Sequence, residues 1–435
     1  MLTPRSELLS SNYPRGKLRY RTGGLMPSGI FAGLKVVDCA TVIAAPAAAM
    51  ILADFGADVI KIEPPGEGDM LRMLSHVPTT PEAQNEWFWQ MDGRNKRSIC
   101  LDLKTPQGSE ILRNLVTNCD VFITNQPYPV RETLKITFAD LEPLNPRMIY
   151  ASLTAYGEVG PERDRKGFDQ LAYWARSGLM DLIRAPDTTP TQGLPGMGDH
   201  PTAVALYASI VTALLHRERT GEGGMVYTSL LANGLWSAAG VAGGAMAGGD
   251  MPGYRANNSI YGAMIRPYKA SDGRWLQFNM IRDEDLLSLL LAGLDAIHLL
   301  ADERFSNPDL LWENRQIFGD ALQEIVGART SDHWLTVMET MGVPINRVAR
   351  VEETVTDQQI LLNDMASQTT NPEIDIPVVI NHPVNVGHLT RTEALRAPAL
   401  GEHSREILRE LGLSESAIND LITTHVIFEP DKDQT

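Results

Sequence analysis

Strand-like apolar runs alternate with helical stretches from residue 34 onward, and this alternation constrains the fold of the chain more than any other feature. The runs occupy residues 34–39, 58–63, 98–103, 120–124 and 148–153. Helical patterns lie between them, such as residues 46–55, which begin with a proline and end before a glycine, and residues 108–118. Strands that alternate with helices form a mostly parallel sheet that is covered on both faces. We therefore predict an α/β fold with a Rossmann-like sheet.

The turn after the first run, residues 40–46, has no G-x-G-x-x-G pattern. That pattern lets the backbone approach the pyrophosphate of a dinucleotide. The sequence also has no G-x-S-x-G nucleophile elbow. A Rossmann-like sheet is thus predicted without the nicotinamide chemistry that often accompanies it, because a fold does not determine a function.

The later part of the chain predicts a second, smaller domain. A long helix is expected over 202–219 and helices dominate 284–341, whereas Asp272-Gly273 between two apolar runs indicates a β-hairpin. We expect an N-terminal extension at 1–29, a large Rossmann-like domain at 30–240 that is completed by 375–435, a glycine-rich linker at 241–258, a small α+β domain at 259–354 and a returning linker at 355–374.

Composition limits the classes of function. The 435 residues carry a formal net charge of −16, which argues against a nucleic-acid partner. No apolar run reaches the roughly 18 residues of a membrane-spanning helix, and no group of His, Cys and carboxylate residues has metal-ligand spacing. The cysteines, Cys39, Cys100 and Cys119, do not stand at C-x-x-C spacing. We expect reduced, buried thiols in a cytoplasmic protein, with no membrane, nucleic-acid or metal partner.

Asp169 stands where the chain passes from an irregular loop, residues 156–161, through Gly167-Phe168 into a helical pattern. A carboxylate at such a boundary can face a cleft and act as a nucleophile on a thioester. It can also do no more than cap the helix. The position of the residue alone leaves both interpretations open.

Six stretches resemble, in the same order, those of the class III CoA-transferase family, the formyl-CoA transferase and carnitine CoA-transferase type. They are ADVIKIE at 57–63, NKRSI at 95–99, NPR at 145–147, GFD at 167–169, RTGEG at 219–223 and APALGEH at 397–403. The resemblance runs from about residue 30 to residue 425. It implies an enzyme with coenzyme A thioesters and a small carboxylic acid as substrates and no tightly bound cofactor. It also implies that the large domain binds CoA and that the chain forms an interlocked homodimer.

The resemblance further implies that Asp169 is the covalent nucleophile, which forms first an aspartyl anhydride and then an aspartyl-CoA thioester. Backbone amides of a glycine loop would assist it, and Gly243 and Gly244 within residues 240–249 are candidates for that loop. The same segment could be a flexible linker or a place of close helix packing. Glu158 resembles an acidic position that lines the family's active site, and a solvated loop carboxylate is the alternative.

Cations are expected near the phosphates of CoA, because the protein as a whole is acidic. Lys96 and Arg97 resemble the family's phosphate-contacting segment, and Arg72 and Lys104 are additional candidates. Tyr156 matches an aromatic position near the bound CoA. These five residues form the predicted CoA-binding set.

The chain departs from the family's pattern at two places. Pro64 and Pro65 stand where formyl-CoA transferases have arginines, and Gly93 stands where many members have asparagine. Both departures bear on the contacts to the adenine and phosphate groups of CoA.

Residues 167–178 and 198–200 resemble the (R)-2-hydroxyisocaproate and phenyllactate CoA-transferase branch of the family. The resemblance implies a monocarboxylic acid as the acceptor of CoA. It also implies a substrate pocket that contains Phe168, Asp199 and His200.

Three alternatives remain open at this stage. A dicarboxylic acceptor would need a further cation, which Arg255 or Arg266 could supply. An α-methylacyl-CoA racemase needs two acid–base groups on opposite faces of the α-carbon, and racemases have histidine where this chain has Phe168, whereas Asp199 matches their other acid. A non-catalytic acyl-CoA-binding protein would have lost its nucleophile, whereas Asp169 is present.

Overall fold

The computed structural model describes residues 29–185, 188–258, 266–278 and 284–429. The described chain divides into two units. The large unit comprises the residues up to Lys166, Asp199–Leu230 and the residues from Gln368 onward, and the small unit comprises Gly167–Gly198 and Leu231–Ser367. The segment that carries Asp169 therefore belongs to the small unit.

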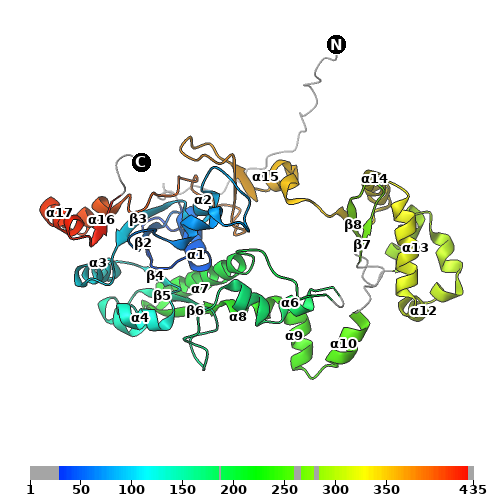
Figure 1. Ribbon diagram of the computed structural model, residues 1–435, viewed down its shortest axis with the longest axis horizontal. Coiled ribbons are helices and arrows are strands. Elements are labelled where there is room, and N and C mark those ends of the chain that lie inside the picture. The colour runs from blue at the N-terminus through cyan, green and yellow to red at the C-terminus, as the bar shows by residue number, and fades with distance from the viewer. Residues whose placement is uncertain (1–28, 186–187, 259–265, 279–283, 430–435) are drawn as a thin grey trace, which may run out of the picture. The chain divides into compact units, whose positions relative to one another are not determined.

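A seven-stranded sheet forms the centre of the large unit (Figure 1). Its strands are β1 (Lys35–Asp38), β2 (Asp58–Glu63), β3 (Lys96–Leu101), β4 (Val121–Thr124), β5 (Ile149–Thr154), β6 (Gly224–Ser229) and β12 (Ile427–Phe428). They lie in the order β12-β3-β2-β1-β4-β5-β6, and all neighbours are parallel except β12, which is antiparallel to β3. This sheet confirms the predicted Rossmann-like α/β fold. The strand order reverses direction between β1 and β4, which is where ligands bind in such sheets.

Helices cover this sheet. They are α1 (Ala44–Asp54), α2 (Trp87–Gly93), α3 (Pro106–Thr117), α4 (Tyr128–Leu134), α5 (Phe138–Leu141), α7 (Asp199–Thr220), α16 (Ser404–Glu410) and α17 (Glu415–Thr423). Further short elements lie outside the small unit's core. They are the 3-10 turns η1 (Met70–His76) and η2 (Glu142–Leu144) and the strands β10 (Ala366–Gln368) and β11 (Val378–Ile380).

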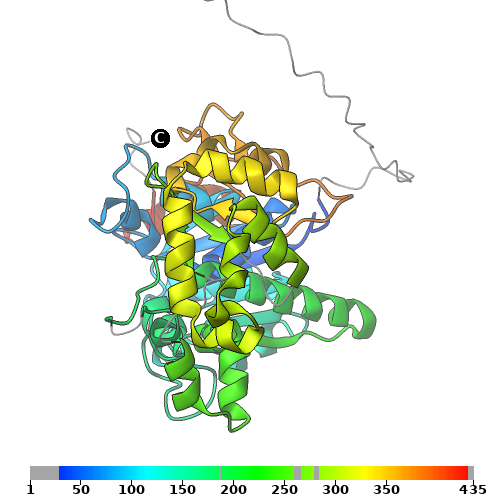
Figure 2. The same cartoon turned by 90° about the vertical axis from the view of Figure 1, so that its right-hand side faces the viewer.

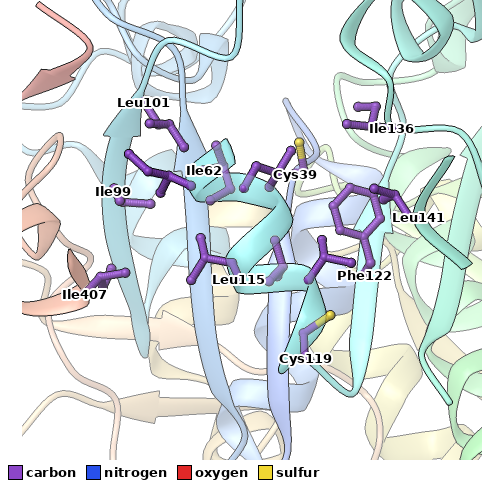
Figure 3. Packing of buried hydrophobic residues seen from close by; sticks show 14 of the residues in the cluster. Cys39, Ile62, Ile99, Leu101, Leu115, Cys119, Phe122, Ile136, Leu141 and Ile407 are labelled. Carbon is purple, nitrogen blue, oxygen red and sulfur yellow. The ribbon is translucent and has the colours of Figure 1, made fainter. Parts of the chain in front are cut away.

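The main core lies between the sheet and α3. Figure 3 shows Leu115 of α3 among Ile62 and Phe122 of the strands, and all three belong to one cluster of buried residues. Side chains alternate between the two faces of a strand. Helix α1 also packs against β1, β2 and β4, and it meets α7 in a separate cluster that includes Met50 and Tyr207.

The sequences of α1 and α3 account for their different environments. All residues of α1 are buried, as expected for a helix that is apolar on every side. Helix α3 is amphipathic and begins with a cap, because the hydroxyl of Thr105 accepts a hydrogen bond from the amide of Gly108 at 3.0 Å. Pro106 occupies the first helical turn, where its missing N–H is not needed.

The core of the small unit is α+β, as predicted. Its strands β7 (Pro267–Lys269), β8 (Trp275–Phe278) and β9 (Ile345–Arg347) form an antiparallel sheet. Figure 2 views this part of the small unit from its helical side. The helices are α11 (Glu284–Gly293), α12 (Pro308–Glu313), α13 (Arg315–Gly327) and α14 (Ser331–Met341). Its core contains buried residues such as Phe278, Phe318 and Trp334. Short elements η4 (Ile297–Ala301), η5 (Glu303–Phe305), η6 (Val351–Thr356) and α15 (Gln358–Leu362) connect these parts.

The predicted hairpin at Asp272-Gly273 is confirmed, because it joins β7 to β8. Gly273 has a φ of +78°, which glycine adopts without strain. The carboxylate of Asp272 accepts hydrogen bonds from the amide and hydroxyl of Ser331 at 2.9 and 2.7 Å. The turn is therefore fastened to the start of α14.

The remaining elements of the small unit flank Asp169 in sequence. They are the π-helix η3 (Gln170–Ala175) and the helices α6 (Leu179–Leu182), α8 (Leu230–Ser237), α9 (Ala239–Met246) and α10 (Met251–Asn258). The glycine-rich residues 241–258, expected to be a linker, thus contain helical structure. The π-helix directly follows Asp169, and turns of this kind are frequent at functional sites.

Candidate active site

Asp169 lies immediately before η3, and its carboxylate does not cap that helix. Its backbone is already helical, with φ −56° and ψ −39°, and its side chain makes no capping hydrogen bond. Instead, Oδ2 accepts a hydrogen bond from the main-chain N–H of Gly198 at 3.1 Å. Only 5% of the residue is exposed. The carboxylate is therefore held by an amide 29 residues further along the chain and is shielded from bulk water.

Packing around Tyr173 explains why residue 198 is a glycine. A Cβ atom on Gly198 would lie 2.7 Å from the ring of Tyr173 and 3.0 Å from the Cβ of Asp169. Tyr173 is buried, and its hydroxyl lies 2.6 Å from the hydroxyl of Ser237 in α8. The Gln170 amide group also donates to the carbonyl oxygen of Gly193 at 2.6 Å. The backbone of residues 193–198 is thereby drawn close to η3.

Apolar side chains stand exposed on the same segments of the small unit. Phe168 and Leu171 flank Asp169, whereas Leu194 and Met197 precede the amide of Gly198. The exposed fraction of Leu194 is 71%. These residues give the neighbourhood of the carboxylate an apolar surface.

The large unit has a cavity of about 410 Å³ at the carboxyl ends of its strands. Thr41 follows β1, Pro64 follows β2, Lys104 follows β3 and Gln126 follows β4, and all four line the cavity. Ligand pockets commonly have volumes of about 300–1,000 Å³. The cavity therefore lies at the switch point of the sheet and has the size of a ligand site.

A network of buried charges lies beside this cavity. Lys61 Nζ lies 2.6 Å from Asp69 Oδ2 and 3.7 Å from Asp38 Oδ1, while Lys96 Nζ lies 2.9 Å from Asp38 Oδ2. All four residues are buried. Burial opposes the charge of Lys61, but Asp38 and Asp69 outweigh it and raise the pKa of the lysine. For Asp69, burial is likewise outweighed by Lys61 and by main-chain N–H donors, so the pKa of its carboxyl is lowered.

Asp69 also fixes the turn that follows β1. Its Oδ1 accepts hydrogen bonds from the amide of Val42 at 2.8 Å and from the hydroxyl of Thr41 at 2.9 Å. Val42 has a φ of 68°, a conformation that β-branched residues rarely adopt. Strained backbone of this kind persists where the surroundings hold it, and it clusters at functional sites.

The predicted CoA-binding cations are not all gathered at the cavity. Lys104 lines it. Lys96 lies in the buried network, where burial lowers its pKa more than Asp38 raises it. Arg97 pairs with Asp58 at 2.7 Å and with two glutamates of α16, at the other end of the strands.

Arg72 is held by a different set of partners. Its guanidinium makes two hydrogen bonds of 2.8 Å to the carboxylate of Glu63 and lies 3.8 Å from the ring centroid of Trp89. The residue is therefore anchored to the end of β2.

Glu158 and Tyr156 lie on the loop after β5. The carboxylate of Glu158 accepts a hydrogen bond from the hydroxyl of Ser152, and its Oε1 lies 3.4 Å from Arg131 Nη1. Arg131 is almost fully buried and also donates to the carbonyl oxygen of Gln126 at 2.6 Å. The ring of Tyr156 lies 5.1 Å from the guanidinium carbon of Arg165. Glu158 is thus a partly buried, paired carboxylate rather than a freely solvated one.

Gly243 and Gly244 lie inside α9 rather than in an open loop. Amides beyond the first turn of a helix are used by the helix itself, so these two N–H groups point along α9. A Cβ on either residue would meet nothing within 4 Å, so close packing does not explain the glycines.

Asp199 and His200 form the first turn of α7. His200 Nε2 lies 3.3 Å from Asp92 Oδ2, and Asp92 is fully buried. This pairing connects α7 with α2 inside the large unit.

Three residues with evident roles in this geometry were not identified from the sequence. Gly198, Asp69 and Arg131 are positioned by contacts between residues that are distant in the chain. Gly198 belongs to a motif that the resemblance included, but nothing in the sequence indicates that its amide meets Asp169.

The cysteines are chemically inert in this fold. Cys39, Cys100 and Cys119 are buried and form no disulfide. Burial raises the pKa of each thiol to about 12. None of them is a thiolate at neutral pH, so none is a competing nucleophile.

Within the described ranges, no group of three or more His, Cys, Asp or Glu residues is arranged to hold a metal ion. A search of the same residues finds no helix with the length and apolar character needed to cross a membrane.

Comparisons with known proteins agree with the sequence resemblance. Residues 31–404 match the family model described as CoA-transferase family III. The (R)-2-hydroxy-4-methylpentanoate CoA-transferase of Clostridioides difficile is 30% identical over 92% of this chain and 99% of its own length. Cinnamoyl-CoA:phenyllactate CoA-transferase of Clostridium sporogenes is 29% identical over 93% and 97%, respectively. Succinyl-CoA:glutarate CoA-transferase of Mus musculus is 29% identical over 91% and 89%.

A solved structure shows the same architecture. The crystal structure of a CAIB/BAIF family protein from Brucella suis has a TM-score of 0.77 and 28% sequence identity, and it covers 88% of this chain and 100% of its own. The fold and its motifs thus define an enzyme of the CoA-transferase class. The chain belongs to CoA-transferase family III.

Proposed function

We propose that this enzyme moves CoA from an acyl-CoA thioester to a carboxylic acid through covalent intermediates on Asp169. The observation that carries the proposal is the buried carboxylate of Asp169, which lies in the family motif and accepts a hydrogen bond from Gly198 rather than capping its helix. A shielded carboxylate is a stronger nucleophile than a hydrated one, because water does not have to leave it before attack.

The reaction has two matched halves. The carboxylate attacks the donor's carbonyl carbon, the C–S bond breaks, and an aspartyl anhydride and the CoA thiolate form. The thiolate then attacks the aspartyl carbonyl, which releases the donor acid as a carboxylate and leaves an aspartyl-CoA thioester. The acceptor carboxylate attacks that thioester, the C–S bond breaks, and a second anhydride and the CoA thiolate form. The returning thiolate attacks the acceptor's carbonyl, so that the acceptor leaves as a thioester and Asp169 is regenerated.

We place CoA in the cavity of the large unit. Its position at the switch point of a Rossmann-like sheet supports this, and Lys104 supplies a cation at its wall. Lys96, Arg97 and Arg72 each contact carboxylates in the structure, so Lys104 is our first choice for a phosphate contact. Tyr156 and Glu158 remain candidates on the neighbouring loop after β5.

We propose an apolar monocarboxylic acid as the acceptor, as the names of two of the relatives suggest. Exposed Phe168, Leu171 and Leu194 near Asp169 support an apolar substrate. The cations considered for a dicarboxylate such as glutarate are paired with aspartates: Arg255 lies 2.6 Å from Asp181, and Arg266 lies 2.9 Å from Asp320. A second carboxylate would have to displace one of these aspartates.

An interlocked homodimer and a cytoplasmic location complete the proposal. Helices α8 to α10 carry large apolar side chains that face solvent in the single chain, including Trp236, which is 81% exposed, and Met246. Aromatic residues and methionine are enriched at protein–protein interfaces. The three buried free thiols agree with a reducing compartment. Light scattering coupled to size exclusion tests the dimer directly, and a monomer at micromolar concentration would contradict it.

The central experiment is peptide-mapped mass spectrometry after the protein is mixed with a short acyl-CoA and hydroxylamine. Hydroxylamine converts an activated carboxylate to a hydroxamate. We expect the modification on Asp169 and on no other acidic residue. If several acyl-CoAs gave no modified Asp169 while the enzyme transferred CoA, the nucleophile assignment would be wrong.

A further inference from the structure

We propose that the main-chain N–H of Gly198 is the donor that stabilises the oxyanion formed at the carbonyl of Asp169 during transfer. The inference rests on the proposed covalent role of Asp169. It adds a specific catalytic group, and a specific oxygen on which that group acts.

The contact that supports this joins Gly198 to a defined oxygen of Asp169. The amide of Gly198 is 3.1 Å from Oδ2 of Asp169. Both residues are buried. A hydrogen bond in a site with little water is worth more than the same bond in solvent, because the local dielectric constant is low.

The two carboxylate oxygens acquire different roles from this contact. One oxygen of Asp169 must become the bridging atom of the anhydride, whereas the other stays a carbonyl oxygen. When the CoA thiolate attacks the aspartyl carbon, the carbonyl electron pair moves onto that second oxygen. The bond to the bridging oxygen then breaks, and the donor acid leaves with its electrons. We assign the carbonyl role to Oδ2, since Gly198 donates to it, and this leaves Oδ1 to attack the thioester.

The donor is held rigidly, as transition-state stabilisation requires. A Cβ at residue 198 would collide with the ring of Tyr173 at 2.7 Å, so the amide can approach Asp169 only as glycine. Tyr173 is fixed in turn by Ser237, whose hydroxyl lies 2.6 Å from the phenol oxygen. The hydrogen bond therefore exists before the reaction and needs no rearrangement during it.

The structure offers this amide in place of those expected from the sequence. Gly243 and Gly244 belong to α9, and their amides are used inside that helix. The amide of Gly198, in contrast, donates to the carboxylate of the nucleophile itself.

An ester in place of one peptide bond tests the inference. Glycolic acid at position 198 replaces the N–H by an oxygen and adds no side chain. The matched control is glycolic acid at Gly412, an exposed residue whose N–H donates to the carbonyl oxygen of Arg409 at 2.8 Å. We expect the ester at 198 to lower kcat by about 10²-fold or more, the usual loss for one oxyanion donor, with little change in the KM for acyl-CoA. The control should keep the wild-type kcat.

A spectroscopic readout separates this role from a structural one. With ¹³C-labelled aspartate, the carbonyl stretch of the aspartyl-CoA thioester should move to higher frequency in the ester variant at 198, because a hydrogen bond to that oxygen is lost. An unshifted band, or a kcat equal to that of the control, would overturn the role of Gly198. Hydroxamate formation at Asp169 in the wild-type enzyme decides separately whether the proposed function itself stands.

A pair of substitutions covers the case in which the ester variant does not fold. Gly198→Ala keeps the N–H but forces the new methyl group against Tyr173, so kcat should fall. Adding Tyr173→Gly removes the two atoms of Tyr173 that this methyl group would meet, the ring carbon Cγ at 2.7 Å and Cβ at 2.9 Å. The double variant should recover at least about tenfold of the loss, since the amide can again approach Oδ2. No recovery in a folded double variant would contradict the inference.

Discussion

Lys61 Nζ lies 2.6 Å from Asp69 Oδ2, and the side chains of both residues are closed to solvent. The other oxygen of Asp69 holds the amide of Val42 at 2.8 Å, at a backbone angle that valine rarely adopts. One buried ion pair therefore shapes the turn that borders the cavity at the switch point of the sheet.

Replacing one member of this ion pair should lower the stability of the folded protein. We expect Asp69→Ala to lower the free energy of unfolding by about 3–5 kcal/mol, because Lys61 would remain charged and buried without its closest carboxylate. Urea denaturation of the full-length protein measures this change. The matched control is Asp164→Ala, which removes the exposed partner of Arg163 and should change stability little. Equal losses of unfolding free energy in the two variants would show that the buried pair contributes no more to stability than the exposed pair.

The same pair predicts how stability depends on pH. The pKa of Asp69 is lowered in the folded state from its ordinary value of 3.8, so the folded protein binds this proton less readily than the unfolded chain. Its contribution is therefore fully present above about pH 4 and is lost as the pH falls through the lowered pKa. The stability difference between the wild-type protein and Asp69→Asn should be constant from pH 5 to pH 7 and shrink below about pH 4. A difference that vanished already near neutral pH would contradict this assignment.

Removing the nucleophile should separate catalysis from binding. We expect Asp169→Ala to lower kcat by roughly 10⁴–10⁶-fold, the range seen when an enzyme loses a residue of its nucleophilic machinery. The Kd for CoA should stay within about threefold, because we place CoA in the cavity of the large unit. Isothermal titration and a transfer assay measure the two quantities. Glu162→Ala, on the loop before the motif, is a suitable control and should keep full activity.

The alternative function, an α-methylacyl-CoA racemase, can be tested separately. Phe168→His introduces the residue that racemases have before the aspartate of this motif. We expect no exchange of the α-hydrogen of an acyl-CoA in deuterated water, because proton transfer needs two bases placed on opposite faces of the carbon. Mass spectrometry of the recovered acyl-CoA follows the exchange. Incorporation of deuterium by this variant would show that the site is closer to racemase chemistry than we propose.

Acceptor choice should respond to Asp181. Arg255 hydrogen-bonds this aspartate and holds the pKa of its carboxyl below the ordinary value, so the pair is ionised at neutral pH. Asp181→Ala would leave Arg255 without that carboxylate. We expect the ratio of kcat/KM for glutarate to that for 4-methylpentanoate to rise by about tenfold, the effect of roughly 1.4 kcal/mol. Asp320→Ala removes the carboxylate that pairs with Arg266, and the same ratio of kcat/KM values is measured for this variant. An unchanged ratio in both variants would show that neither arginine determines the choice of acceptor.

Much of the fold was predictable because buried parallel strands appear in the sequence as continuous apolar runs. β2 spans Asp58–Glu63, as expected, and the hairpin at Asp272-Gly273 lies where its turn residues indicated. The helical character of residues 241–258 was not anticipated, since each glycine costs a helix about 1 kcal/mol relative to alanine. In α9, alanines and a valine alternate with the glycines and offset part of that cost.

The candidate active site was harder to predict because its main contacts join residues that are far apart in the sequence. Lys96 and Arg97 were identified as cations, but a sequence does not show that Asp38 and Glu410 will be their partners. The contact from Gly198 to Asp169 depends on how residues 193–198 return to η3. Such pairings are set by tertiary packing, which has no short-range pattern.

The burial of Cys39, Cys100 and Cys119 has a practical consequence for following the reaction. A thiol-reactive dye added to the native enzyme should leave all three side chains unmodified, since each is covered and stays protonated. Any colour that develops during turnover would then come from coenzyme A that has escaped between the two half-reactions. Because the protein itself does not react with such reagents, the colour measures the escape of the CoA thiolate directly.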